Sequence, residues 1–162
     1  MEYFPSIEDI KKAHVRIKPY IEQTPFLKST FINEMLKTSI FFKCENFQKV
    51  AAFKFRGAMN ALLQLSDEEL IRGVATHSSG NHAAALALAA KKRNSKAFIV
   101  MPRTAPKMKI NAVRGFGAEI TFCEPTLEAR ESNLETVIKK TGAVFIHPYN
   151  NHKIITGQGT CA

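Results

Sequence analysis

The chain has 162 residues, of which 45% are hydrophobic, and its 23 basic and 14 acidic side chains give a net charge of +9. This length and apolar content suit an ordinary globular chain and exclude a disordered or low-complexity one. The basic residues are scattered singly or in pairs, so nucleic-acid binding is the least favoured interpretation of the charge.

Three cysteines lie far apart and none has the spacing of metal ligands, so we expect no metal site among them and a reducing, cytoplasmic location. The first residues carry acidic groups and no signal-peptide core. The longest apolar run, at residues 83–90, is too short to cross a bilayer, so we expect no membrane partner.

Capping residues and hydrophobic periodicity predict the elements of the first part of the chain. These are a helix from Ser6 to about residue 18, a strand at 26–28, a helix to about residue 36, a strand at 40–42, a helix at 56–65 and one turn after Ser66. Strands and helices then alternate, with strands at 73–76, 97–101, 119–122 and 143–146 and helices at 81–92, 106–116 and 126–140. Such alternation favours an α/β fold with a mainly parallel sheet.

Residues 53–58, Phe-Lys-Phe-Arg-Gly-Ala, place one lysine between two aromatic side chains. Such neighbours would remove water from the Lys54 amine and make it a better nucleophile. A neutral lysine amine is the group that forms an imine with an aldehyde cofactor. Taken alone, however, the residues better fit an alternating strand end that leaves Lys54 and Arg56 in solvent.

Residues 76–82, Thr-His-Ser-Ser-Gly-Asn-His, lie between an expected strand and an expected helix. Such a loop sits at the carboxyl end of a parallel strand, where ligands bind, and the backbone N–H groups of the helix start attract anions. The candidates to bind a carboxylate are Ser78, Ser79, Gly80 and Asn81. Taken alone, a plain helix cap by Ser79 or Asn81 is the favoured interpretation, and His82 is better explained by packing.

Two later stretches give weaker signals. Residues 147–150, His-Pro-Tyr-Asn, end a strand and are candidates to point at the same cleft as the loop at residues 76–82. Residues 157–160, Gly-Gln-Gly-Thr, fit a ligand contact and a close-packed helix start equally well. That last helix opens near residue 154 and stops almost at once, so we expect a fragment or truncated product of a longer protein.

Together, these motifs resemble the serine/threonine dehydratase and serine racemase family, which are pyridoxal-phosphate (PLP) enzymes of the tryptophan-synthase-β fold type, or fold type II. The matching segments are 45–48 (Glu-Asn-Phe-Gln), 53–58, 78–82, 101–102 (Met-Pro), 147–148 and 157–160. The likeness covers essentially the whole chain and reverses the preference for the structural interpretations. It implies an α/β small domain with a parallel sheet at 73–149, inserted in a larger, here truncated, α/β domain at 1–72 and 150–162.

The resemblance also implies roles for the motif residues. Lys54 would form an imine with PLP and later take the substrate's α-proton, Phe53 would pack near the cofactor ring, and Asn81 would hydrogen-bond the ring hydroxyl. The substrate carboxylate would be held by Ser78, Ser79, Gly80, Asn81 and His82. Ser79 corresponds to the second acid/base of the racemases. The expected reaction converts a small hydroxy-amino acid to a 2-oxo acid and ammonia, or to its enantiomer.

The chain departs from the family at Ala51, where glycine is common, and at Ala84, where glutamine is usual. The family's phosphate cradle and divalent-cation site would lie beyond residue 162, so we expect poor activity from this chain alone. Full-length members are usually homo-oligomers. The alternatives are a truncated, non-catalytic paralogue that acts as a binding or interaction module, and a β-replacing synthase such as cysteine synthase, which is ranked lower.

Overall fold

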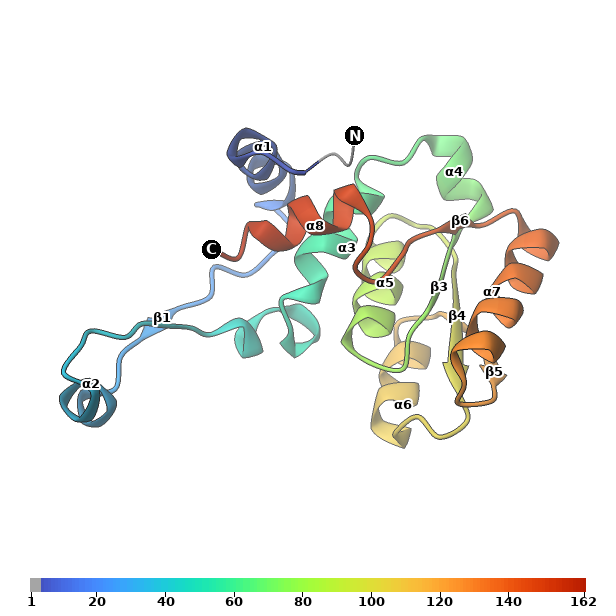
Figure 1. Ribbon diagram of the computed structural model, residues 1–162. Helices are drawn as coiled ribbons and strands as arrows, with labels where there is room; N and C mark the ends of the chain where they lie inside the picture. Colours follow the sequence, from blue (N-terminus) through green and yellow to red (C-terminus); the bar gives the residue numbers. More distant parts are fainter. Residues whose placement is uncertain (1–3) are drawn as a thin grey trace.

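The computed structural model describes residues 4–162 and shows a parallel four-stranded sheet between helical layers (Figure 1). In sheet order the strands are β5 (Glu119–Cys123), β4 (Ala97–Pro102), β3 (Val74–His77) and β6 (Val144–Phe145). The helices that flank them are α5 (Asn81–Lys92) and α6 (Lys107–Gly115) on one face and α7 (Leu127–Thr141) on the other. The predicted α/β class with a parallel sheet is confirmed.

Side-chain caps fix the starts of several helices. Ser6 and Asp9 form a reciprocal capping box at α1 (Ile7–Ile17), and Ser66 and Glu69 form another at α4 (Asp67–Arg72). Because a cap satisfies amide groups that the helix itself leaves unpaired, these helix starts are readable from sequence.

The segment at residues 26–43 forms an arm that extends away from the sheet (Figure 1). Strands β1 (Phe26–Leu27) and β2 (Phe42–Lys43) pair antiparallel, and α2 (Thr30–Leu36) lies between them in the chain. The strand expected at 40–42 is therefore β2, which begins two residues later than predicted. Two short 3-10 turns follow, η1 (Glu45–Phe47) and η2 (Lys49–Ala51).

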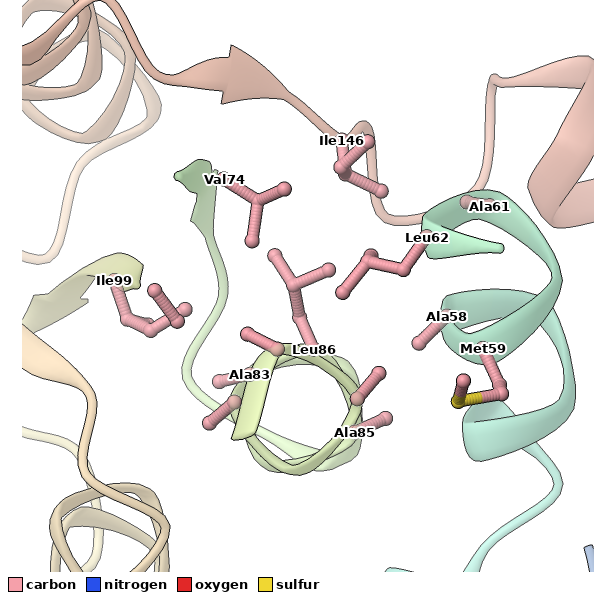
Figure 2. Packing of buried hydrophobic residues seen from close by; sticks show 14 of the residues in the cluster. Ala58, Met59, Ala61, Leu62, Val74, Ala83, Ala85, Leu86, Ile99 and Ile146 are labelled. Atoms are coloured by element: carbon pink, nitrogen blue, oxygen red, sulfur yellow. The ribbon is translucent and has the colours of Figure 1, made fainter. Parts of the chain in front are cut away.

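The main core lies where α5 packs between the sheet and α3 (Lys54–Leu62). Figure 2 shows Leu86 of α5 reaching between Val74 of β3 and Leu62 of α3. The alanine-rich sequence of α5 lets its backbone approach both neighbours closely. A smaller core, made by Ala75, Val100, Cys123, Leu134 and Ala143, fills the space toward α7. The division into a small domain at 73–149 and a larger domain at 1–72 and 150–162 stays a prediction.

Helix α8 (His152–Gly159) begins two residues before the expected position and packs tightly on α3. A Cβ atom added to Gly157 would lie 2.7 Å from the Cα of Gly57 and 2.7 Å from the Cβ of Asn60. The two helices thus meet through glycines, which explains the Gly-Gln-Gly-Thr stretch by close packing.

Candidate active site

Lys54 is the first residue of α3, not the end of a strand. Its half-buried side chain donates a hydrogen bond from Nζ to the Pro148 carbonyl oxygen, at 3.3 Å. The amine lies 5.2 Å from the ring centroid of Phe53, whereas Phe55 is fully buried in the core. Of the two expected aromatic neighbours, Phe53 is therefore the one that lies beside the amine.

The interpretation that left Lys54 and Arg56 in solvent is wrong. Arg56 is 2% exposed and forms an ion pair with Glu45. Its Nη1 also donates to the Thr160 carbonyl oxygen of α8, at 3.3 Å. The helix that begins at Lys54 is thus fixed from two sides, by the Glu45 turn and by α8.

Gln158 of α8 also holds the start of α3. Its Oε1 accepts from the Gly57 amide at 3.2 Å, and its Nε2 donates to the Lys54 carbonyl at 3.5 Å. Because these bonds join residues about one hundred positions apart, they could not be read from local sequence. They fix the backbone from which the Lys54 side chain extends.

The serine loop, residues 78–81, follows β3 at its carboxyl end. The Ser78 amide donates to the Val100 carbonyl at 3.0 Å, and Ser78 Oγ accepts from the Gly80 amide at 3.3 Å. Gly80 is the N-cap residue of α5, and no side chain caps this helix. The interpretation of Ser79 or Asn81 as a plain cap is therefore wrong, and the helix start is open to an anion.

Two site candidates differ in exposure. Asn81 is exposed on the first turn of α5, whereas His82 is only 3% exposed. The His82 Nε2 atom lies 3.4 Å from the Ile146 carbonyl oxygen, so this nitrogen carries the proton. Burial, together with the charge of nearby Lys54, lowers the pKa of His82 from 6.5 to about 4. The ring is therefore neutral at pH 7. It is buried in the fold, in agreement with the packing role that His82 taken alone suggested.

The segment after β6 brings these groups together. The Ile146 carbonyl accepts a hydrogen bond from His82, and the Pro148 carbonyl, two residues later, accepts one from Lys54. The lysine amine therefore lies near His82, in the first turn of α5. The roles that the resemblance implies for Lys54 and for the loop residues stay predictions.

Sequence reasoning missed Lys109 of α6. A Cβ atom added to Gly80 would lie 3.5 Å from Lys109 Nζ, so a positive charge stands beside the serine loop. Nothing in the sequence near Lys109 distinguishes it from the other lysines. A positive charge at this position would attract a negatively charged group to the loop.

Among residues 4–162, no group of three or more histidine, cysteine, aspartate or glutamate side chains is arranged to hold a metal ion. No helix in the same range has the length and apolar character needed to cross a membrane.

The residues present fit PLP. The aldehyde of PLP needs an amine, and Lys54 supplies one at the carboxyl edge of the sheet. A pyridine ring needs an apolar neighbour, and Phe53, 41% exposed, presents a ring beside that amine. An amino-acid substrate carries a carboxylate, and the uncapped start of α5 offers free amide donors.

An amine near an uncapped helix start in a parallel α/β fold fits a PLP-binding protein, because the amine can bind an aldehyde and the helix start favours an anion. In agreement, the sequence model of the family described as pyridoxal-phosphate dependent enzymes matches residues 17–162. The chain belongs to this family, and its fold is that of PLP fold type II.

Individual relatives are similar along nearly all of this chain. A β-hydroxyaspartate dehydratase from Paracoccus denitrificans is 51% identical over 160 residues, which are 99% of this chain and 51% of that protein. A serine racemase from Arabidopsis thaliana is 52% identical over 161 residues, or 99% of this chain and 49% of that protein. The structure of maize serine racemase superposes with a TM-score of 0.96 at 49% identity, covering 98% of this chain and 48% of the other. The chain thus spans about half the length of these relatives.

Proposed function

We propose that this chain supplies the lysine and the carboxylate-binding loop of a PLP-dependent hydroxy-amino-acid dehydratase or serine racemase. The observation that carries the proposal is the Lys54 amine beside the open start of α5. Support for the substrate class comes from relatives named serine racemase and β-hydroxyaspartate dehydratase at about 50% identity.

Each motif residue has a defined task in this proposal. Lys54 binds the cofactor through Nζ, and the same nitrogen, when freed and neutral, removes the proton from the substrate's α-carbon. Phe53 contacts the cofactor ring and Asn81 binds the ring hydroxyl. PLP, when bound, supplies an electron sink for the negative charge that develops at the α-carbon.

The serine loop binds the substrate carboxylate through the backbone amides at the start of α5, with Ser78 and Gly80 shaping the turn. His82 contributes its backbone, since its ring is buried. Ser79 Oγ is the second proton donor, which racemisation needs and elimination does not. The partial positive charge of the helix start and the Lys109 ammonium both favour a carboxylate here.

The function is tested on the natural gene product and on the 162-residue chain with L-serine, L-threonine and β-hydroxyaspartate. We expect 2-oxo acid or D-serine from the natural product, neither from Lys54→Ala, and a selective loss of D-serine from Ser79→Ala. Exposed Lys12→Ala is the matched control and should retain activity. PLP binding without turnover of any hydroxy-amino acid would favour the non-catalytic binding module instead.

The whole protein is also proposed to be a homo-oligomer in the cytoplasm. The three cysteines of this chain are free thiols, which suits a reducing compartment. Light scattering on the natural product tests the oligomer, and a monomer at all concentrations would overturn it.

A further inference from the structure

The turn whose Pro148 carbonyl accepts the hydrogen bond from Lys54 is stabilised by a histidine ring. His147 Nδ1 accepts hydrogen bonds from the Tyr149 amide at 3.2 Å and from the Asn150 amide at 2.8 Å. A ring nitrogen that accepts two N–H groups carries no proton, so the imidazole is neutral and its hydrogen is on Nε2. Both bonds fold the chain between β6 and α8 into one tight turn.

One of these bonds acts on the peptide group that faces Lys54. The Pro148 carbonyl and the Tyr149 amide belong to the same planar unit, and no cis peptide bond occurs in residues 4–162. In a trans peptide the carbonyl and the amide hydrogen point in opposite directions. Fixing the Tyr149 N–H against His147 therefore directs the Pro148 carbonyl toward Lys54 Nζ, 3.3 Å away.

We propose that His147 is a positioning residue for Lys54, because its unprotonated Nδ1 sets the peptide plane whose carbonyl holds the lysine amine. The inference rests on the proposed role of Lys54 and extends it to a residue that does not touch the reacting atoms. Holding the amine at one position reduces the ordering that must occur when the aldehyde reacts.

The surroundings of His147 keep its ring in place and neutral. Its ring packs edge-on to Tyr149, with centroids 4.5 Å apart, and also contacts His77 of β3, with centroids 6.3 Å apart. Burial lowers the pKa of His147 below 6.5, while Glu131 of α7 partly opposes this shift. His82 of α5 is also near enough to feel its charge. A proton on Nδ1 would make this nitrogen a donor, so it could no longer accept the hydrogen bonds from the Tyr149 and Asn150 amides. The turn would then lose both bonds.

Two variants separate the hydrogen-bonding role from packing. His147→Asn keeps a short side-chain acceptor that can bond amides two and three residues on, as asparagine does in turns. His147→Phe keeps a ring against Tyr149 but removes the acceptor. In His147→Phe, we expect the hydrogen-exchange protection of the Asn150 amide to fall about tenfold. In His147→Asn, this protection should stay within about twofold of that in the unsubstituted chain.

The lysine itself gives the decisive readout. Each variant is labelled with formaldehyde and cyanoborohydride, and Lys54 is compared by peptide mass mapping with exposed Lys12. The labelling of Lys54 relative to Lys12 should rise severalfold in His147→Phe and stay unchanged in His147→Asn. Only the first substitution frees the Lys54 amine. An unchanged Lys54 ratio in His147→Phe, despite lost Asn150 protection, would overturn the proposal.

A pH titration of the unsubstituted chain provides the second test. Imidazole nitrogen NMR should show an unprotonated Nδ1 at neutral pH, and Asn150 protection should be lost as the pH falls below 6.5 and the ring is protonated. A proton on Nδ1 at pH 7 would contradict the hydrogen-bond assignment. Formaldehyde labelling needs no PLP, so failure to bind PLP with these results intact would overturn only the proposed function.

Discussion

Arg56 donates two parallel hydrogen bonds to Glu45, from Nε to Oε2 and from Nη2 to Oε1, each 2.7 Å long. The two side chains are only 3% and 11% exposed. Burial by itself would raise the pKa of Glu45, but the hydrogen bonds from Arg56 and Thr24 and the charges of Arg56 and Lys43 lower it overall. The pair ties the turn that precedes Lys54 to the first turn of α3.

Removing Arg56 should be costly, because it takes the main hydrogen-bond donor and counter-ion from a Glu45 carboxylate that is largely shielded from water. We expect Arg56→Ala to lower the free energy of unfolding by about 3–5 kcal/mol, measured by urea denaturation. Lys11→Ala, which breaks an exposed pair with Glu8, is the control and should cost less than about 1 kcal/mol. Equal losses in the two variants would contradict the buried pair.

The contact of α3 with α8 leaves no room for a methyl group at Gly157, which lies against Gly57 and Asn60. Gly157→Ala should lower the free energy of unfolding by about 1–3 kcal/mol through overpacking. Gly115 in α6 has no heavy atom within 4 Å of an added Cβ, so Gly115→Ala should be neutral or stabilise by up to about 1 kcal/mol. Thermal unfolding of both variants would show no contrast if α8 did not cross α3 at this point.

Ala51 adopts a left-handed backbone with φ of 52°, which is strained for a residue with a Cβ. Ala51→Gly should therefore raise the free energy of unfolding by about 0.5–1 kcal/mol. Neighbouring Ala52 is extended at φ −161° and 6% exposed, so Ala52→Gly should lower it. Denaturant titration distinguishes the two, and a loss of stability in both would exclude strain at Ala51.

Histidine 82 predicts a pH-dependent stability. Its pKa is about 4 in the folded chain and 6.5 when unperturbed, so protons bind the unfolded state more strongly between these values. Its contribution is complete above pH 6.5 and is lost as the pH falls toward 4, by about 3 kcal/mol in total.

The difference between variants isolates this contribution from other titrating groups. His82→Gln keeps a donor for the Ile146 carbonyl but does not titrate, so it should lose less stability than the unsubstituted chain between pH 7.5 and 4.5. Exposed His14→Gln should follow the unsubstituted chain. Parallel curves for His82→Gln and the unsubstituted chain would show that the ring is not buried neutral.

Much of the fold was predictable because it is encoded locally. The capping boxes at Ser6 and Ser66 and the strand–helix alternation after residue 73 place helices and strands to within one or two residues over most of the chain. The start of α3 could not be predicted in this way, because the sequence Phe-Lys-Phe-Arg fits both a strand and a helix. The ion pair of Arg56 with Glu45, which is not visible in the local sequence, stabilises the helix there.

The candidate site was predictable only in part. The motifs indicated Lys54 and the serine loop, but the contacts that orient them join distant residues. Gln158 reaches Lys54 and Gly57 from another helix, and Lys109 approaches Gly80 from α6. Such pairs have no sequence signature, because the fold alone brings them together.

The identity of the PLP-binding lysine is tested most directly by incubating the chain with PLP, reducing with borohydride and mapping the labelled peptide by mass. We expect the label on Lys54, its loss in Lys54→Arg, and its retention in Lys109→Arg, which alters a lysine whose Nζ lies beside Gly80. A label on Lys109, or one spread over the surface lysines and unchanged by Lys54→Arg, would contradict the assignment of Lys54.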